Sequence, residues 1–215
     1  MADAVVIENL YMTFGKETVL KNVNIAFECG KIHGIVGRNG SGKTVMMKCI
    51  LGFLKPTKGS VTVFGRKIGL ECNFAPQTGM IIEAPGFIPT ESGYNNLKWL
   101  IGLRSKVNKK RLEEVMYTVG LDPESKKPVG KYSLGMRQRL GIAQAIIEQP
   151  RLLVLDEPMN GLDNRGVEDM RKLFLRLNKE NGTTILLASH NPMDINTLCD
   201  TVCEMDGGVL KKLLC

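Results

Sequence analysis

The sequence has no apolar run long enough to cross a membrane, since none approaches the roughly 18–20 residues that a spanning helix needs. Its first residues lack a basic segment followed by an apolar core, so no signal peptide is expected. Its six cysteines are scattered, and no second pair or histidine cluster completes a zinc site beside Cys199 and Cys203. We therefore expect a cytoplasmic protein with reduced, mostly buried thiols.

A concentrated block of one charge and an internal repeat are also missing. The net charge of +7 permits contact with nucleic acid or an anionic membrane. However, the basic residues are spread along the chain, and the short cluster at 109–111 is explained equally well as a solvated helix face. We therefore predict no nucleic-acid partner. The 215 residues are enough for one large domain or for one domain with an inserted subdomain.

One motif stands out from this ordinary composition. Residues 37–44 read Gly-Arg-Asn-Gly-Ser-Gly-Lys-Thr, which fits the phosphate-binding loop G-x-x-x-x-G-K-[ST]. Glycines let consecutive backbone N–H groups point at one anion, Lys43 can reach the β- and γ-phosphates, and the Thr44 hydroxyl can bind Mg²⁺. A glycine-rich turn that binds nothing would give Lys43 no reason to stand there. The predicted nucleotide contacts are Gly37, Arg38, Asn39, Gly40, Ser41, Gly42, Lys43, Thr44 and Val45.

The surrounding pattern predicts an α/β fold. Apolar or β-branched runs bounded by turn residues predict strands at 5–7, 23–28, 32–36 and 61–64. A helix over 45–51 leaves the loop, and from 84 to 136 the pattern turns helical, with Asn108 as an N-cap. The last third alternates, with helices at 135–148, 165–178 and 194–198, strands at 152–155 and 184–188, and a hairpin around 207–208. Alternating β and α units imply a parallel sheet covered by helices.

Two carboxylates end the apolar run at 152–155. Buried parallel strands read this way, and side chains alternate faces along a strand, so we expect Asp156 and Glu157 to point in different directions. This division suits two roles: Asp156 would hold hydrated Mg²⁺, and Glu157 would polarise the attacking water. Without the phosphate loop, two ordinary acids at a solvated strand end would be the simpler interpretation.

Residues 132–140, Tyr-Ser-Leu-Gly-Met-Arg-Gln-Arg-Leu, begin a helix shortly before that strand. Ser133 is a natural N-cap, and Gly135 allows an anion to approach the helix start. At this point the chain resembles the ATP-binding cassette (ABC) family. Ser133 and Gly135 match the serine and second glycine of the family signature, whereas Leu134 and Met136 depart from its commonest form.

Three further segments resemble this family in the same order along the chain. Residues 160–163 resemble the D-loop, His190 resembles the switch histidine, and Phe14 stands where an aromatic residue stacks on adenine. The resemblance covers nearly the whole chain. It implies a phosphate-loop ATPase core with a mainly parallel sheet and an N-terminal antiparallel β subdomain, formed by 1–83 and 137–215. It also implies a helical subdomain at 84–136.

Glu83 departs from the family pattern, because glutamine usually ends the strand that enters the helical subdomain. Gln77 is nearby, but the Pro-Gly-Phe that follows Glu83 resembles the bacitracin-export and lantibiotic-immunity branch, as does the Ser-Leu-Gly-Met signature. A carboxylate could bind Mg²⁺ more strongly than an amide, but it also adds a negative charge near the γ-phosphate. Which effect dominates stays open at this point.

The resemblance implies an ATPase whose active site is divided between two subunits, either two copies or this chain and a paralogue. ATP would hold the halves together until hydrolysis lets them open. The nucleotide would contact the phosphate loop and Phe14 of one subunit and Ser133 and Gly135 of the other. The implied catalytic residues are Glu157, His190 and Lys43, and the implied Mg²⁺ ligands are Thr44, Asp156 and Glu83.

A transporter of this kind would need separate membrane permease subunits. They would dock on the helical region and on 83–95, which would place the chain on the inner face of the cell membrane. The branch implies export of a peptide antibiotic or another amphiphile. The main alternative is a non-transport ABC ATPase, an ATP-gated clamp on DNA or ribosomes, although such proteins usually carry two cassettes or a long coiled-coil insertion. Two further alternatives are a phosphate-loop kinase and an inactive regulatory ATP-binding module.

Overall fold

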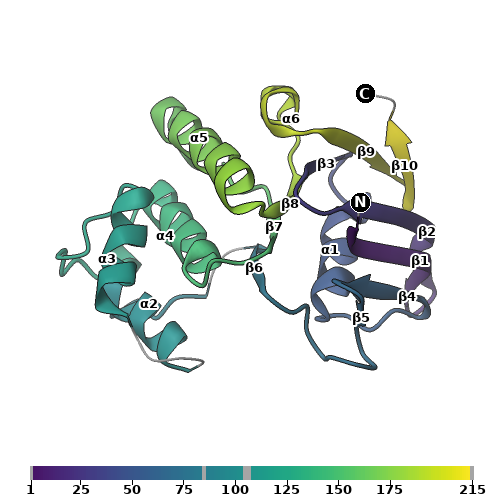
Figure 1. Cartoon of the computed structure of the whole chain (residues 1–215), viewed down its shortest axis with the longest axis horizontal. Helices are drawn as coiled ribbons and strands as arrows, with labels where there is room; N and C mark the ends of the chain where they lie inside the picture. The colour runs from purple at the N-terminus through teal and green to yellow at the C-terminus, as the bar shows by residue number, and fades with distance from the viewer. Residues whose placement is uncertain (1, 84–85, 104–107, 214–215) are drawn as a thin grey trace.

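The computed structural model describes residues 2–83, 86–103 and 108–213. Residues 84–85, where the predicted helical region begins, and Cys215 lie outside this part of the chain. Over the described residues the strands form two sheets (Figure 1), a four-stranded one in the order β2-β1-β4-β5 and a six-stranded one in the order β10-β9-β3-β8-β7-β6. The α/β architecture predicted from the sequence is therefore confirmed.

The N-terminal sheet is antiparallel. Its strands are β1 (Asp3–Phe14), β2 (Glu17–Glu28), β4 (Lys58–Val63) and β5 (Arg66–Lys67). β1 and β2 are much longer than the predicted strands at 5–7 and 23–28. Asn9 and Asn22 have φ angles of 47° and 54°, and the β1–β2 register shifts between Ile7 and Leu10. Such bulges break the alternation of apolar and polar residues, so the pattern revealed only part of each strand.

The six-stranded sheet forms the centre of the molecule. Its parallel strands are β6 (Thr78–Ile81), β7 (Leu152–Asp156), β8 (Thr184–Ala188), β3 (Ile32–Val36) and β9 (Thr201–Asp206), and β10 (Val209–Leu213) is the antiparallel hairpin partner of β9. Leu152 and Val154 belong to one hydrophobic cluster, and Leu153 and Leu155 belong to the other. The sheet is therefore buried on both faces, as parallel strands covered by helices require.

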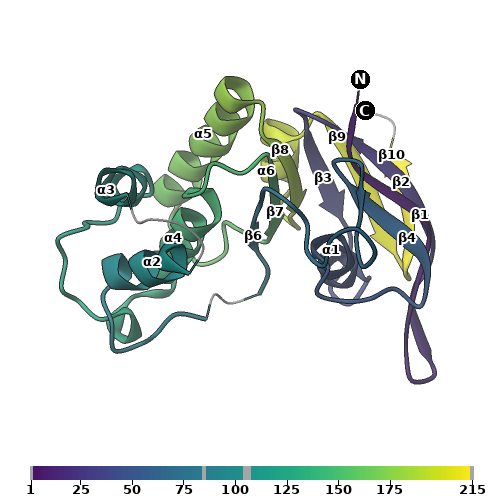
Figure 2. The ribbon, with the colours of Figure 1, turned by 60° about the horizontal axis from the view of Figure 1, so that its bottom comes forward.

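Helices cover both faces of this sheet. α1 (Lys43–Leu51) lies between the two sheets (Figure 2), with Met46, Met47 and Ile50 fully buried in a cluster that includes residues of β1, β2 and β4. α5 (Asn164–Asn181) and α6 (Pro192–Leu198) contribute to the cluster on the opposite face. Burial raises the pKa of the Cys49 thiol on α1 to about 12, so this thiol stays protonated at neutral pH.

The helical end of the molecule consists of α2 (Gly93–Gly102), α3 (Lys109–Thr118), the 3₁₀ turn η1 (Val129–Lys131) and α4 (Leu134–Ile146) (Figure 1). The Asn108 side chain accepts the N–H of Arg111 at 3.2 Å, so the predicted N-cap is confirmed. α4 also packs closely on β6, because a Cβ on Gly79 would overlap the carbonyl oxygen of Ala145. No described helix is both long enough and apolar enough to span a lipid bilayer.

Candidate functional site

The predicted phosphate loop connects β3 to α1, and its glycines are required by the backbone. Gly37, Gly40 and Gly42 have φ angles of 148°, 78° and 111°, which side chains other than glycine rarely adopt. A Cβ on Gly37 would also overlap the carbonyl oxygen of Met205 in β9. The loop makes a second contact with the β9–β10 hairpin, because the Gly208 N–H donates to the Ser41 carbonyl at 3.1 Å. The loop therefore turns tightly into the N-terminus of α1, where backbone N–H groups lack partners within the helix.

The side chains of the loop fit a polyphosphate. Lys43 is only 7% exposed and donates from Nζ to the carbonyl oxygens of Gly37 at 2.7 Å and Arg38 at 3.1 Å. Ser41 Oγ is buried and has no hydrogen-bond partner among the described residues. A buried hydroxyl without a partner is costly unless a ligand or water supplies one. A cation and an unsatisfied hydroxyl beside the start of α1 form a suitable cradle for an anion.

Thr44 and Asp156 meet beside this loop, although 112 residues separate them in the sequence. The Thr44 hydroxyl donates to Asp156 Oδ2 at 2.5 Å. Both residues line a cavity of about 530 Å³, the phosphate-loop cavity, which is formed mainly by residues 39–45. The described residues contain no cluster of three or more His, Cys, Asp or Glu side chains suited to a metal. One carboxylate and one hydroxyl fit Mg²⁺, which keeps several waters and takes its remaining ligands from phosphates.

The expected reason for the different directions of Asp156 and Glu157 is wrong. Asp156 is the last residue of β7, and Glu157 lies beyond the strand with a φ of +49°, so strand alternation does not apply to it. Both residues line the phosphate-loop cavity. They nevertheless contact different groups, since Glu157 Oε2 lies 2.9 Å from Nδ1 of His190. The left-handed backbone conformation of Glu157, and not the alternation of side chains along a strand, accompanies the different contacts of these two carboxylates.

His190 follows β8, and its side chain is 66% exposed. It does not line the phosphate-loop cavity and reaches the site through Glu157. The structure thus brings together the loop, Thr44, Asp156, Glu157 and His190, whose roles toward ATP and Mg²⁺ stay predictions. An imidazole paired with a carboxylate beside a phosphate cradle can orient a water and exchange protons with it.

Phe14, Ser133 and Gly135 lie outside the lining of the phosphate-loop cavity. Phe14 ends β1 and is 46% exposed. Ser133 caps α4, where its hydroxyl accepts the N–H of Met136 at 3.2 Å. A Cβ on Gly135 would come within 2.9 Å of the carbonyl oxygen of Gly161, so this glycine also allows 160–163 to pack against the start of α4. Within one chain, these three residues do not join the loop.

Glu83 lines the phosphate-loop cavity but contacts a residue that sequence reasoning missed. It follows β6 with a φ of +57°, and its Oε1 lies 2.6 Å from Nζ of Lys48. Lys48 stands one helical turn after Thr44 on α1, and that spacing could have placed it on the same helix face. Gln138 was also missed: its Nε2 donates to the carbonyl oxygen of Pro158 at 2.8 Å, next to Glu157.

Residues 20–160 match the protein family described as ABC transporter. The chain belongs to this family. The match covers more than half of the chain and includes the phosphate loop, the signature and both carboxylates, whereas Phe14 and His190 fall outside it. The family predicted from the order of motifs is therefore confirmed.

Two relatives show the branch within this ABC family. The bacitracin transport ATP-binding protein BcrA of Enterococcus faecalis is 44% identical over 205 residues, which cover 94% of this chain and 66% of the relative. The lantibiotic transport ATP-binding protein SrtF of Streptococcus pyogenes is 37% identical over 196 residues, which cover 91% of this chain and 84% of the relative. The chain thus spans just under two thirds of the length of BcrA. The predicted likeness to the bacitracin and lantibiotic branch is confirmed.

Solved structures show the same architecture. MJ0796, described as a bacterial ABC transporter cassette with a dimeric structure, superposes with a TM-score of 0.87 at 25% identity, covering 98% of this chain and 99% of MJ0796. The predicted phosphate-loop ATPase fold, with its mainly parallel sheet and N-terminal antiparallel sheet, is therefore that of an ABC transporter cassette.

Proposed function

We propose that this chain hydrolyses ATP with Mg²⁺ and powers a separate membrane permease that exports a peptide antibiotic or a similar amphiphile. One observation carries the chemical part of the proposal: Thr44 with Asp156, and Glu157 with His190, converge beside the phosphate loop. The choice of cargo is supported by the relatives BcrA and SrtF, which are described as transport ATP-binding proteins for bacitracin and lantibiotics. They also favour transport over the clamp on DNA or ribosomes.

Each residue of the site has a role in this proposal. Loop N–H groups and Lys43 bind the phosphates, and Ser41 gains the partner that it lacks. Thr44 and Asp156 hold Mg²⁺, which would neutralise charge on the phosphates when bound. Glu157 orients the attacking water and accepts its proton, with His190 held beside it. Glu83 can join the metal because its contact with Lys48 is exposed and easily broken.

The proposal needs a second subunit because the site is incomplete within one chain. Ser133 and Gly135 lie off the phosphate-loop cavity, yet Ser133 marks the N-terminus of α4, an end that attracts anions. Facing the γ-phosphate from a second copy or a paralogue, this helix end would complete the site. The dimeric structure described for MJ0796 supports this arrangement.

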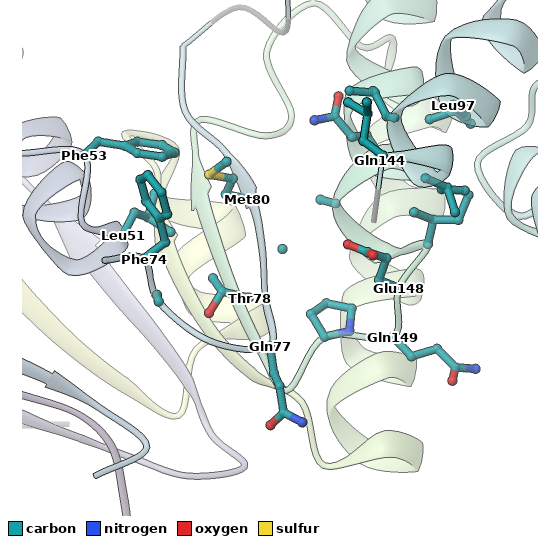
Figure 3. A pocket seen from close by; sticks show the side chains of 18 residues that line it. Leu51, Phe53, Phe74, Gln77, Thr78, Met80, Leu97, Gln144, Glu148 and Gln149 are labelled. Carbon is teal, nitrogen blue, oxygen red and sulfur yellow. The ribbon is translucent and has the colours of Figure 1, made fainter. Parts of the chain in front are cut away.

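A groove beside β6 is suited to the permease. It has a volume of about 540 Å³ and lies between the end of α1 and β6 on one side and α2 and α4 on the other. Figure 3 shows Phe53 and Phe74 facing Leu97 and Gln144 across this groove. Phe53 and Phe74 are 45% and 60% exposed, and Leu103, which also lines the groove, is 83% exposed. Exposed apolar side chains around a hollow fit an apolar helical segment of a partner.

The first experiment compares ATP hydrolysis by the purified chain and by Glu157→Gln. We expect the variant to lose at least about 100-fold of the turnover, because a general base contributes roughly 10²–10⁴-fold. Size-exclusion chromatography in ATP·Mg²⁺ should show a dimer that persists in the variant. Glu180→Gln, an exposed site near the end of α5, is the matched control and should hydrolyse ATP normally. Equal turnover in Glu157→Gln and wild type would remove Glu157 from the mechanism.

A further inference from the structure

The loop that carries His190 must be restrained by contacts other than those of the histidine side chain itself. The His190 side chain is 66% exposed, yet its Nδ1 lies 2.9 Å from Glu157 Oε2. An exposed side chain gains little restraint from packing, so the distance between His190 and Glu157 depends on where the backbone places its Cα. The contacts of the neighbouring residues, Ser189 and Asn191, therefore determine where His190 lies.

A buried ion pair lies directly beneath this loop. Arg171 of α5 donates from Nε at 2.9 Å and from Nη2 at 2.5 Å to Oδ1 of Asp194 in α6. Arg171 is 8% exposed and Asp194 is 2% exposed. Burying two charges costs several kcal/mol of desolvation in general, so an isolated pair of this kind is weak evidence for a role in stability alone.

The second oxygen of Asp194 restrains the residues on either side of His190. The hydroxyl of Ser189, which is 2% exposed, donates to Asp194 Oδ2 at 3.0 Å and accepts the N–H of Asn191 at 3.1 Å. The Asp194 N–H in turn donates to the Asn191 carbonyl at 3.1 Å. Ser189 and Asn191 are thus both fixed on Asp194, and Arg171 fixes Asp194.

We propose that Arg171 and Asp194 are positioning residues that hold His190 against Glu157. This inference rests on the proposed ATPase function. Neither residue lines the phosphate-loop cavity, so they act through the loop and not on the substrate. Arg171 belongs to α5, the helix that starts directly after residues 160–163 with Asp163 as its N-cap.

The test uses the two histidines of the chain, His33 and His190, as reporters. In Asp194→Asn, which keeps the size of the side chain, we expect the imidazole NMR signals of His190 to shift and broaden while those of buried His33 stay in place. Should Asp194→Asn fail to fold, Ser189→Ala leaves the ion pair intact and should disturb His190 in the same way. Ser189→Thr keeps the hydroxyl, so its His190 signals should match those of the wild type. Glu180→Gln, at an exposed site near the end of α5, is the control.

Hydrolysis supplies a second measurement. We expect Asp194→Asn to lower kcat about tenfold with KM changed by less than about twofold, and to cause no further loss in a His190→Ala background. An equal loss in both backgrounds would show a merely structural role and overturn the proposal, as would unchanged His190 signals in the folded variants. If the wild-type chain hydrolyses no ATP, the proposed function fails, while the imidazole signals still decide whether the pair positions His190.

Discussion

Glu83 stands where the family resemblance leads us to expect a glutamine, and in the structure it pairs with Lys48. Its contact with Lys48 joins two side chains that are 66% and 27% exposed. Ion pairs at such exposure contribute between about 0 and 1 kcal/mol, so little opposes the movement of the carboxylate toward a metal. In the proposed mechanism, Glu83 would leave Lys48 and bind the Mg²⁺ that accompanies the nucleotide.

We expect Glu83→Gln to raise the Mg²⁺ concentration for half-maximal ATPase activity by about 3–10-fold, because an amide is a weaker ligand for this hard cation than a carboxylate. The free energy of unfolding should change by less than about 0.5 kcal/mol. The measurement is ATPase activity against free Mg²⁺ at saturating ATP, with Glu180→Gln as the control. Superimposable Mg²⁺ curves for variant and wild type would contradict the role of Glu83 at the metal.

At the scale of single residues, sequence motifs identify side chains that lie close together in the structure, while their roles stay predictions. Lys43, Thr44, Asp156, Glu157 and His190 were all named from motifs, and the structure brings them together. The backbone conformation of Glu157 was not predictable, because a φ of +49° leaves no trace in a pattern of apolar residues. The contact of Lys48 with Glu83 joins residues 35 positions apart and forms only in the folded chain, where α1 and the residue after Ile82 come together.

At the scale of elements, three strands meet at His33. Its Nε2 lies 2.9 Å from the Glu28 carbonyl of β2, and its Nδ1 lies 2.7 Å from the Thr201 hydroxyl of β9. Burial lowers the pKa of His33 below its ordinary value of 6.5, although the Glu28 carbonyl and the charge of Asp200 act in the opposite direction. The imidazole therefore helps to join the two sheets in its neutral form.

This lowered pKa predicts a stability that depends on pH. Between the folded pKa and 6.5 the unfolded chain binds more protons, so the contribution of His33 is present above pH 6.5 and is lost as pH falls through the folded pKa. We expect urea midpoints to fall between pH 7.5 and 5.5. His33→Gln should flatten this dependence, and His190→Gln, at an exposed site, should keep it. If the urea midpoint of His33→Gln changed with pH as steeply as that of the wild type, the attribution of this dependence to His33 would be wrong.

Helices and strands could be predicted where residues close in the sequence mark their boundaries. The N-caps at Asn108 and Ser133 and the apolar strands at 152–155 and 184–188 all have local signals, and the structure shows each of them. The long strands β1 and β2 were predicted only in part, because left-handed asparagines interrupt their alternation. A pattern of period two cannot follow a strand through a bulge.

At the scale of the whole molecule, the groove and the phosphate-loop cavity share two elements. α1 carries Lys43 and Thr44 at its start and ends at Leu51 in the groove, and β6 lines the groove and leads to Glu83. No sequence pattern could show the groove, since it forms from four elements that are separated along the chain. A partner in the groove would therefore contact the same helix and strand that lead to the nucleotide.

We expect the double variant Phe53→Ser/Phe74→Ser to bind the proposed permease at least about tenfold more weakly, because two exposed apolar rings are lost from the proposed docking surface. The ATPase activity of the isolated chain should stay within about twofold of wild type, since neither ring lines the phosphate-loop cavity. Co-purification with a tagged permease is the measurement. Leu70→Ser, 78% exposed and outside the groove, is the control. Full retention of the permease would exclude this groove as the docking site.

The contacts of the phosphate loop with Met205 and Gly208 also set an order of assembly during synthesis. Residues 37–45 leave the ribosome early, but the hairpin on which the loop rests is made about 160 residues later. At roughly 5–20 residues per second, this interval lasts on the order of ten seconds or more. We therefore expect the phosphate loop of a nascent chain to lack these supports until the β9–β10 hairpin is made, so that nucleotide binding would be a late event in folding.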